Sequence, residues 1–356
     1  MKTRKPKRIK VGPNRYISES DPTFIVAEMS ANHVQDLRVA KKIIREAKKS
    51  GADAIKIQTL DPGKITLPSR NKYFRIRHPR WKKMRTLYDL YKKANTPWEW
   101  HSELKNLAED EGLIFFSTPF DKSAVDFLET MDVGLYKIAS FELVDHDLIR
   151  YVAKTGRPIV MSTGMATMSE IGEAVDAAKG AGAKDIILLK CISSYPADPA
   201  EMNLRTIPYL RDKFNLQIGL SDHSLDNAVP IAAVSLGARF IEKHFTLSRK
   251  KNSLDSFFSI EPAEMRALVK DIRIVEKAFG TVFSGLTTGE KQSRIFRRSI
   301  FAITNIKKGE MFCEDNIGII RPANGLKPKY IDAVLGKLAK RDIKVGTPLS
   351  WSLVKR

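Results

Sequence analysis

A short apolar run that ends in polar residues recurs eight times between residues 24 and 244 of this 356-residue chain. Each run is rich in β-forming residues and apolar on both faces, which is typical of strands covered by helices in a parallel sheet. Helix-like stretches separate most of the runs; the stretch 36–49, for example, places Ile43 and Ala47 on one face. The eight runs are 24–28, 54–59, 113–118, 135–140, 158–163, 186–191, 217–222 and 238–244. Eight such units in about 265 residues predict a (β/α)8 TIM barrel.

A second domain is expected because the chain is longer than one hydrophobic core usually requires. After residue 279 the pattern changes to short β-forming runs separated by glycine turns, as in Asn305-Ile-Lys-Lys-Gly-Glu310. We expect a barrel over residues 21–283, a linker over 284–293 and a small β-rich domain over 294–356. Residues 1–20 contain seven Lys or Arg and one Glu, and are expected to form a basic, flexible tail.

The net charge of +20 lies mainly in this tail and after residue 287 rather than in the barrel. A basic tail can bind nucleic acid, but the aromatic residues do not interleave with the basic clusters as in known nucleic-acid motifs, so nucleic acid is not the expected partner. A positive surface would instead attract a small anionic substrate. The two cysteines show no metal or redox spacing, and no run approaches 18 apolar residues. We therefore expect a cytoplasmic protein without a membrane partner.

Polar residues at the carboxyl ends of barrel strands face one cavity. Lys56 and Lys137 lie inside apolar strands, and because a buried ammonium without a partner is costly, each implies an anion or a carboxylate nearby. With the hydroxyls of Thr118, Ser140 and Ser162, they predict a site for phosphate and carboxylate groups. The other polar residues at the strand ends are Glu28, Gln58, Glu142, Ser193, Tyr195, Ser221, Asp222, His223 and His244.

Four of these residues suggest more specific chemistry. Glu28 and Glu142 are candidates for general acid–base catalysis or for binding a sugar hydroxyl, with a salt bridge to a neighbouring lysine as the structural alternative. His223 and His244 follow neighbouring strands, so both imidazoles are expected at one rim of the barrel, where they can bind a divalent metal. A lysine Schiff base is disfavoured because a lysine surrounded by phosphate-binding hydroxyls stays protonated.

Several ordered segments of the chain resemble the sialic acid synthase family. They are residues 27–33, 51–59, 116–120, 137–142, 161–165, 219–223 and 241–245. The C-terminal part resembles the antifreeze-like (SAF) domain of that family, through residues 296–299, 306–310, 320–325 and 346–349. Within the family the chain is most similar to the pseudaminic acid synthases, through residues 28–33, 96–101, 193–197 and 254–262.

The resemblance implies an enzyme that condenses phosphoenolpyruvate with an N-acetylated hexose, giving a nine-carbon keto acid and phosphate by C–O cleavage. For a pseudaminic acid synthase the hexose is 2,4-diacetamido-2,4,6-trideoxy-L-altrose. A sibling synthase for N-acetylneuraminate or legionaminate is the alternative, and an anion- or nucleic-acid-binding protein is a remote one. Assays with each hexose would separate these functions.

The resemblance also implies roles for individual residues. His223 and His244 match ligands of a divalent metal, Mn²⁺ or Mg²⁺. Matches to phosphoenolpyruvate-binding positions are Lys56, Thr118, Lys137, Ser140, Ser162 and Ser221. Matches around the sugar and the reaction centre are Glu28, Gln58, Glu142, Tyr195 and Asp255. Ser193 stands where neuraminate synthases carry asparagine, a departure that can alter sugar or phosphate contacts.

Two further features have structural alternatives. Arg321 matches an arginine that reaches into the barrel of a second subunit, which implies a domain-swapped homodimer; a surface arginine before a turn is the alternative. Residues 61–97 are long for a connection between strand and helix, and are expected to form a lid over the site or a packing insertion.

Overall fold

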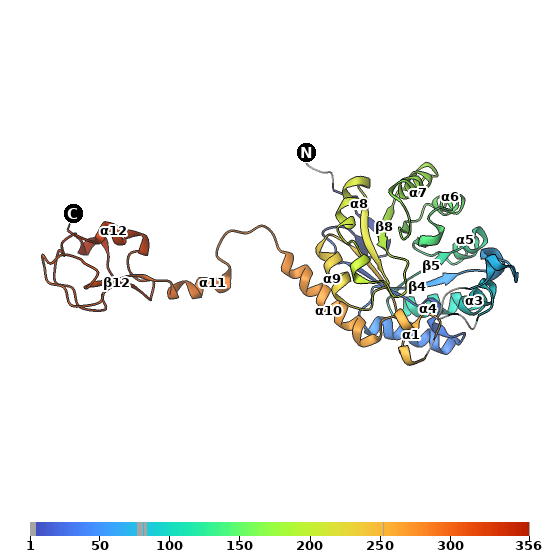
Figure 1. Cartoon of the computed structure of the whole chain (residues 1–356), viewed down its shortest axis with the longest axis horizontal. Helices are drawn as coiled ribbons and strands as arrows, with labels where there is room; N and C mark the ends of the chain where they lie inside the picture. Colours follow the sequence, from blue (N-terminus) through green and yellow to red (C-terminus); the bar gives the residue numbers. More distant parts are fainter. Residues whose placement is uncertain (1–4, 77–80, 82–83, 252, 356) are drawn as a thin grey trace. The chain divides into compact units, whose positions relative to one another are not determined.

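The computed structural model describes residues 5–76, 81, 84–251 and 253–355. The chain folds into two compact units, with the boundary between Gly280 and Thr281 (Figure 1). In the part of the chain described, no helix combines the length and apolar character needed to cross a membrane.

The first unit contains a closed barrel of eight parallel strands in the order β10-β3-β4-β5-β6-β7-β8-β9. Its strands are β3 (Phe24–Glu28), β4 (Ala54–Thr59), β5 (Ile114–Pro119), β6 (Tyr136–Ile138), β7 (Ile159–Ser162), β8 (Ile186–Cys191), β9 (Gln217–Asp222) and β10 (Phe240–His244). All eight overlap the predicted runs, so the predicted TIM barrel is confirmed.

Helices surround the strands in Figure 1 and bury the outer side chains of the barrel. The main ones are α1 (Leu37–Lys49), α4 (His101–Asp110), α5 (Lys122–Glu129), α6 (His146–Ala153), α7 (Met168–Gly180), α8 (Thr206–Phe214), α9 (Ala228–Ser235) and α10 (Pro262–Phe279). In α1, Ala40, Ile43 and Ala47 are fully buried, and the side chain of Asp36 caps the first turn by accepting from the Arg38 amide. Aromatic residues such as Phe116 and Phe240 fill the interior of the barrel.

Part of the basic N-terminal segment differs from the flexible tail predicted for residues 1–20, of which residues 1–4 lie outside the described residues. Residues 9–17 form an antiparallel hairpin of β1 (Ile9–Gly12) and β2 (Arg15–Ile17). Ile9, Val11 and Ile17 are buried in the same cluster as the inner barrel side chains. Alternating apolar residues between the charges therefore anchor this segment to the barrel core, because each removes apolar surface from water.

The segment 61–97 combines short helices with irregular chain. It contains α2 (Pro62–Ile65), a 3-10 turn at Lys72–Phe74 and α3 (Leu87–Ala94), whereas positions 77–80 and 82–83 lie outside the described residues. The Trp81 indole nitrogen donates to the Leu254 carbonyl at 3.2 Å, which ties this segment to the loop after β10.

The second unit is the small β-rich domain that the sequence predicts. It contains α11 (Thr288–Ser293), within the segment expected as a linker, and an antiparallel pair of β11 (Ser299–Ala302) and β12 (Ile317–Ile320). A single turn of helix, α12 (Ile331–Val334), and several isolated bridges complete it. Its core is centred on buried apolar residues such as Ile300 and Phe312.

Candidate active site

A cavity of about 540 Å³ lies at the carboxyl ends of the barrel strands. Thirteen of the predicted residues line it: Lys56, Gln58, Thr118, Lys137, Ser140, Glu142, Ser162, Ser193, Tyr195, Ser221, His223, His244 and Asp255. Glu28 is fully buried in β3 and contacts a lining lysine instead of the cavity. Arg321 follows β12 in the second unit and is exposed there, so its predicted role in a partner's barrel stays a prediction.

Lys56 is paired with two buried carboxylates. Its ammonium lies 2.6 Å from Glu28 and 3.7 Å from Glu242, and it donates to the Thr118 hydroxyl at 3.1 Å. The second Glu242 oxygen accepts from Ser221 at 3.1 Å. Burial raises the pKa of Glu28 to about 7, Lys56 opposes this change and the Glu242 carboxylate adds to it. Glu28 can therefore gain or lose a proton near neutral pH.

Lys137 has a different environment. Its ammonium donates to the Ser162 hydroxyl at 2.6 Å and to the Ile138 carbonyl at 3.1 Å, and in the described part of the chain it forms no ion pair with a carboxylate. Burial lowers the pKa of Lys137, and Glu242 partly opposes this effect. A buried ammonium that faces a cavity without a counter-ion is suited to bind an anion from solution.

The hydroxyls of Ser140 and Ser193 lie close to the backbone at Gly164. The Gly164 amide donates to the Ser140 hydroxyl at 3.1 Å. A Cβ at this position would lie 2.2 Å from the Ser193 hydroxyl and 2.7 Å from that of Ser140. Glycine therefore allows these two hydroxyls to converge on the cavity.

The two predicted metal-ligand histidines lie side by side. The ring centroids of His223 and His244 are 5.3 Å apart, and the rings of Tyr195 and Phe258 pack against both. His223 Nδ1 lies 2.8 Å from the Ile192 carbonyl, which leaves Nε2 for another ligand. His244 Nδ1 is buried and has no hydrogen-bond partner among the described residues.

These features fit a divalent metal, although only two side chains would bind it. Burial, with the nearby His223, holds the pKa of His244 well below its ordinary value, so its ring is neutral, the form that binds metals. Among the described residues no group of three or more His, Cys, Asp or Glu side chains is arranged to hold a metal ion. Water or substrate oxygens would therefore complete the coordination, as in open catalytic sites.

The side of the cavity beneath the segment 61–97 combines polar and apolar groups. Asp255 accepts from the Ser30 hydroxyl at 2.5 Å, and Gln58 donates to the same hydroxyl at 3.0 Å. Burial raises the pKa of Glu142 to about 7, and its Oε2 is buried without a partner among the described residues. Apolar side chains line the cavity nearby, and we call this set the apolar wall: Ile65, Leu90, Tyr91, Phe120 and Leu254.

Sequence reasoning missed several lining residues. Glu242 shares a strand face with His244, two positions later, so the two-residue period of a strand could have identified it. Ser30 and Phe258 lie in single 3-10 turns that follow β3 and β10, where no sustained periodic pattern predicts which way a side chain points. The apolar wall was not predicted because Leu90 looks like an ordinary core position of a helix.

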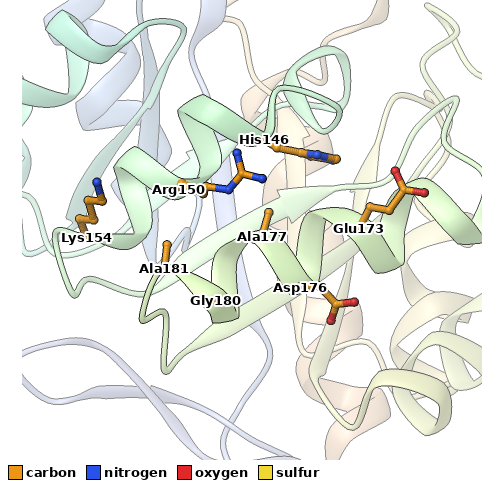
Figure 2. A pocket seen from close by; sticks show the side chains of 8 residues that line it. All are labelled: His146, Arg150, Lys154, Glu173, Asp176, Ala177, Gly180 and Ala181. Carbon is orange, nitrogen blue, oxygen red and sulfur yellow. The ribbon is translucent and has the colours of Figure 1, made fainter.

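A second hollow lies away from the strand ends. This groove has a volume of about 790 Å³ and lies between α6 and α7. Figure 2 shows its lining side chains, among which Arg150, Lys154, Glu173 and Asp176 are exposed. It contains none of the predicted site residues, and its opposite charges are solvated. We therefore assign the chemistry to the smaller cavity at the strand ends.

Comparison with known proteins gives similarities over nearly the whole chain. A model of the NeuB family matches residues 43–283, and a model of the SAF domain matches residues 297–355. A pseudaminic acid synthase of Campylobacter jejuni is 46% identical over 92% of this chain and 95% of that protein. A pseudaminic acid synthase of Helicobacter pylori is 43% identical over 94% of this chain and 98% of that protein.

A solved structure shares both the fold and a related sequence. The N-acetylneuraminic acid synthetase of Leptospira borgpetersenii superposes with a TM-score of 0.72 and is 32% identical, over 81% of this chain and 95% of that one.

Proposed function

The chain belongs to the NeuB family, and from this premise we propose that it condenses phosphoenolpyruvate with 2,4-diacetamido-2,4,6-trideoxy-L-altrose. In this reaction C3 of phosphoenolpyruvate bonds to the aldehyde carbon of the hexose, water adds to C2, and the C2–O bond to phosphate breaks. The products are a nine-carbon 2-keto acid and phosphate. The observation that carries the proposal is Lys137, a buried ammonium without a carboxylate partner in the described chain, in a cavity that also holds His223 and His244.

The binding of phosphoenolpyruvate is assigned to the two lysines and the hydroxyls beside them. Lys137 with Ser162, and Lys56 with Thr118, provide donors on neighbouring strands for phosphate and carboxylate oxygens. Such charge-assisted hydrogen bonds are about twice as strong as neutral ones and fix the orientation of the anion. These residues would therefore hold C3 of phosphoenolpyruvate in a fixed position relative to the hexose.

Proton movement is assigned to carboxyl groups whose pKa lies near neutrality. Burial raises the pKa values of both Glu28 and Glu142 to about 7. Glu142 lines the cavity and can exchange a proton with a substrate there, whereas Glu28 contacts Lys56 and would act through that lysine. His223 and His244 would hold Mn²⁺ or Mg²⁺, which when bound polarises the aldehyde oxygen as a Lewis acid. Tyr195 and Phe258 pack against these two rings and limit the access of water to them.

The apolar wall supports a hexose that carries few hydroxyls. The proposed acceptor has a methyl group at C6 and an acetamido group at C4, whereas N-acetylmannosamine has hydroxyls at both positions. A hydroxyl placed against Leu90 or Leu254 would lose its hydrogen bonds to water, which costs about 1–3 kcal/mol. We therefore expect kcat/KM to be about 10²-fold higher for the proposed trideoxy hexose than for N-acetylmannosamine.

The assay that tests this function supplies phosphoenolpyruvate, Mn²⁺ and one hexose at a time, and follows phosphate release. We expect release with 2,4-diacetamido-2,4,6-trideoxy-L-altrose and at least about 10-fold slower release with N-acetylmannosamine. The legionaminate precursor is also a trideoxy hexose that differs only in stereochemistry, so its rate is compared directly with that of the altrose derivative. Faster release with either alternative hexose would contradict the proposed substrate. No release with any hexose, together with tight and steeply salt-dependent nucleic-acid binding, would contradict the enzymatic function itself.

The apolar wall makes a separate prediction for Leu90→Asn. Asparagine would place a polar amide in the wall to which we assign the C6 methyl group of the acceptor. We therefore expect kcat/KM for the altrose derivative to fall about 10- to 100-fold, with the KM for phosphoenolpyruvate unchanged. Leu67→Asn is the matched control, because Leu67 lies in the same segment, is 57% exposed and does not line the cavity. Equal kinetics for the two variants would contradict the role assigned to the wall.

The oligomeric state and the cellular compartment of the protein are part of the proposed function. We place the protein in the cytoplasm, where phosphoenolpyruvate is available, and propose a domain-swapped homodimer in which Arg321 of one subunit completes the site of the other. The exposure of Arg321 after β12 supports this role, because an exposed guanidinium can bind a carboxylate or phosphate of the partner's substrate.

A further inference from the structure

A buried ion pair joins the two strand ends that carry the histidines. Lys243 precedes His244 in β10, Asp222 precedes His223 at the end of β9, and the two residues are paired in the sheet. The Lys243 ammonium donates to Asp222 Oδ2 and to the Ser224 carbonyl, both at 2.7 Å. The other Asp222 oxygen accepts from the Ser224 amide at 2.9 Å. Both charged side chains are 1% exposed, and neither lines the cavity.

Stability alone does not explain this ion pair. Removing two charges from water costs several kcal/mol per ion, and apolar residues of similar size are often as stabilising or more so. The pair fixes local geometry, because its hydrogen bonds connect the end of β10 to the Asp222 side chain and to the Ser224 backbone, the residues on either side of His223. It therefore fixes the distance between the two strand ends and the conformation of the turn that carries His223.

His244 has particular need of such support. Metal-binding histidines usually donate their second nitrogen to a carbonyl or carboxylate, which orients the ring. His223 has this contact with the Ile192 carbonyl, whereas His244 Nδ1 has no such partner among the described residues. Ring packing against Phe258, with a centroid distance of 4.7 Å, limits rotation of His244 but does not set its distance from His223.

We propose that Lys243 and Asp222 are positioning residues that hold His223 and His244 at the spacing needed to bind a divalent cation. This inference rests on the metal site of the proposed function. It assigns no chemical step to either residue, because neither reaches the cavity. Loss of the pair should therefore weaken cation binding before any substrate is present.

The test measures Mn²⁺ binding to the purified full chain by electron paramagnetic resonance, without substrates, together with the melting temperature. The double variant Asp222→Leu/Lys243→Met removes both charges, so no single charge is left buried. We expect it to fold and to bind Mn²⁺ about 10- to 100-fold more weakly than the wild type. Lys190→Met is the matched control: Lys190 is also a buried strand lysine, but it donates to the Cys191 carbonyl and should leave Mn²⁺ affinity unchanged.

A second variant keeps the test decisive if the double variant does not fold. Lys243→Arg retains the charge but replaces a compact ammonium with a planar guanidinium, so we expect a folded chain with about 3- to 10-fold weaker Mn²⁺ binding. If a folded Asp222→Leu/Lys243→Met or Lys243→Arg chain binds Mn²⁺ as tightly as the wild type, the positioning role is overturned and the proposed metal site is not affected. A wild-type chain that binds no Mn²⁺ would contradict the proposed metal site, and this inference with it.

Discussion

Replacing His244 with alanine is expected to abolish the condensation of phosphoenolpyruvate with the hexose while leaving the barrel folded. His244 lies at the carboxyl end of β10, above the layers of apolar side chains that hold the barrel together. Loss of a bound cation would remove several kcal/mol of transition-state stabilisation, which corresponds to a rate at least about 10³-fold lower. The fold should change little because the chemistry of a barrel lies at its strand ends and its stability lies elsewhere.

Phosphate release and the melting temperature, measured on the same preparations, check this expectation. His223→Ala should behave in the same way, because the two ring centroids lie 5.3 Å apart and both rings are assigned to the same cation. His146→Ala is the matched control: His146 is a half-buried histidine on α6, outside the cavity, and its loss should leave turnover within about 2-fold of the wild type. Full turnover by a metal-stripped His244→Ala chain would contradict the proposed metal site.

The barrel could be predicted because each of its strands is apolar on both faces. Runs such as 186–191 have no alternation that a surface strand would show, and burial between an inner and an outer layer explains this pattern. The hairpin at residues 9–17 could not be predicted in this way. Its strands are short, and its three buried apolar side chains are embedded in a strongly basic segment whose charges dominate the composition.

The positions of the predicted site residues that lie on strands followed from strand periodicity, whereas that of Asp255 came only from the family resemblance and the electrostatic roles of the lysines came from neither. Both Lys56 and Lys137 were predicted to need an anion or a carboxylate, and only the structure separates the two cases. Lys56 has two carboxylates, one of them on Glu242, a strand neighbour that the sequence analysis did not single out. Sequence spacing gives the face on which a residue lies, whereas the identity of its partner depends on the closure of the barrel.

This difference between the two lysines predicts opposite effects on stability. Lys137→Met removes a buried charge that has no carboxylate partner in the described chain, so we expect the chain to become more stable by about 1 kcal/mol. Lys56→Met leaves Glu28 and Glu242 without their shared cation, and should destabilise the fold by about 3–5 kcal/mol. Lys137→Met is thus expected to gain stability and lose function, because a site that is preorganised for a ligand is often a source of instability when the ligand is absent.

Binding of phosphoenolpyruvate should nevertheless be lost in Lys137→Met. The Lys137 side chain is buried and its ammonium donates to the Ser162 hydroxyl at 2.6 Å. A charge-assisted hydrogen bond from such an ammonium to phosphate or carboxylate is worth about 1.5–3 kcal/mol. We therefore expect the KM for phosphoenolpyruvate to rise about 10- to 150-fold, and the melting temperature to rise as well. Steady-state kinetics and thermal melts of both lysine variants provide the comparison. A Lys137→Met chain that is less stable than the wild type, with an unchanged KM, would show that Lys137 is a structural cation and that the anion binds elsewhere.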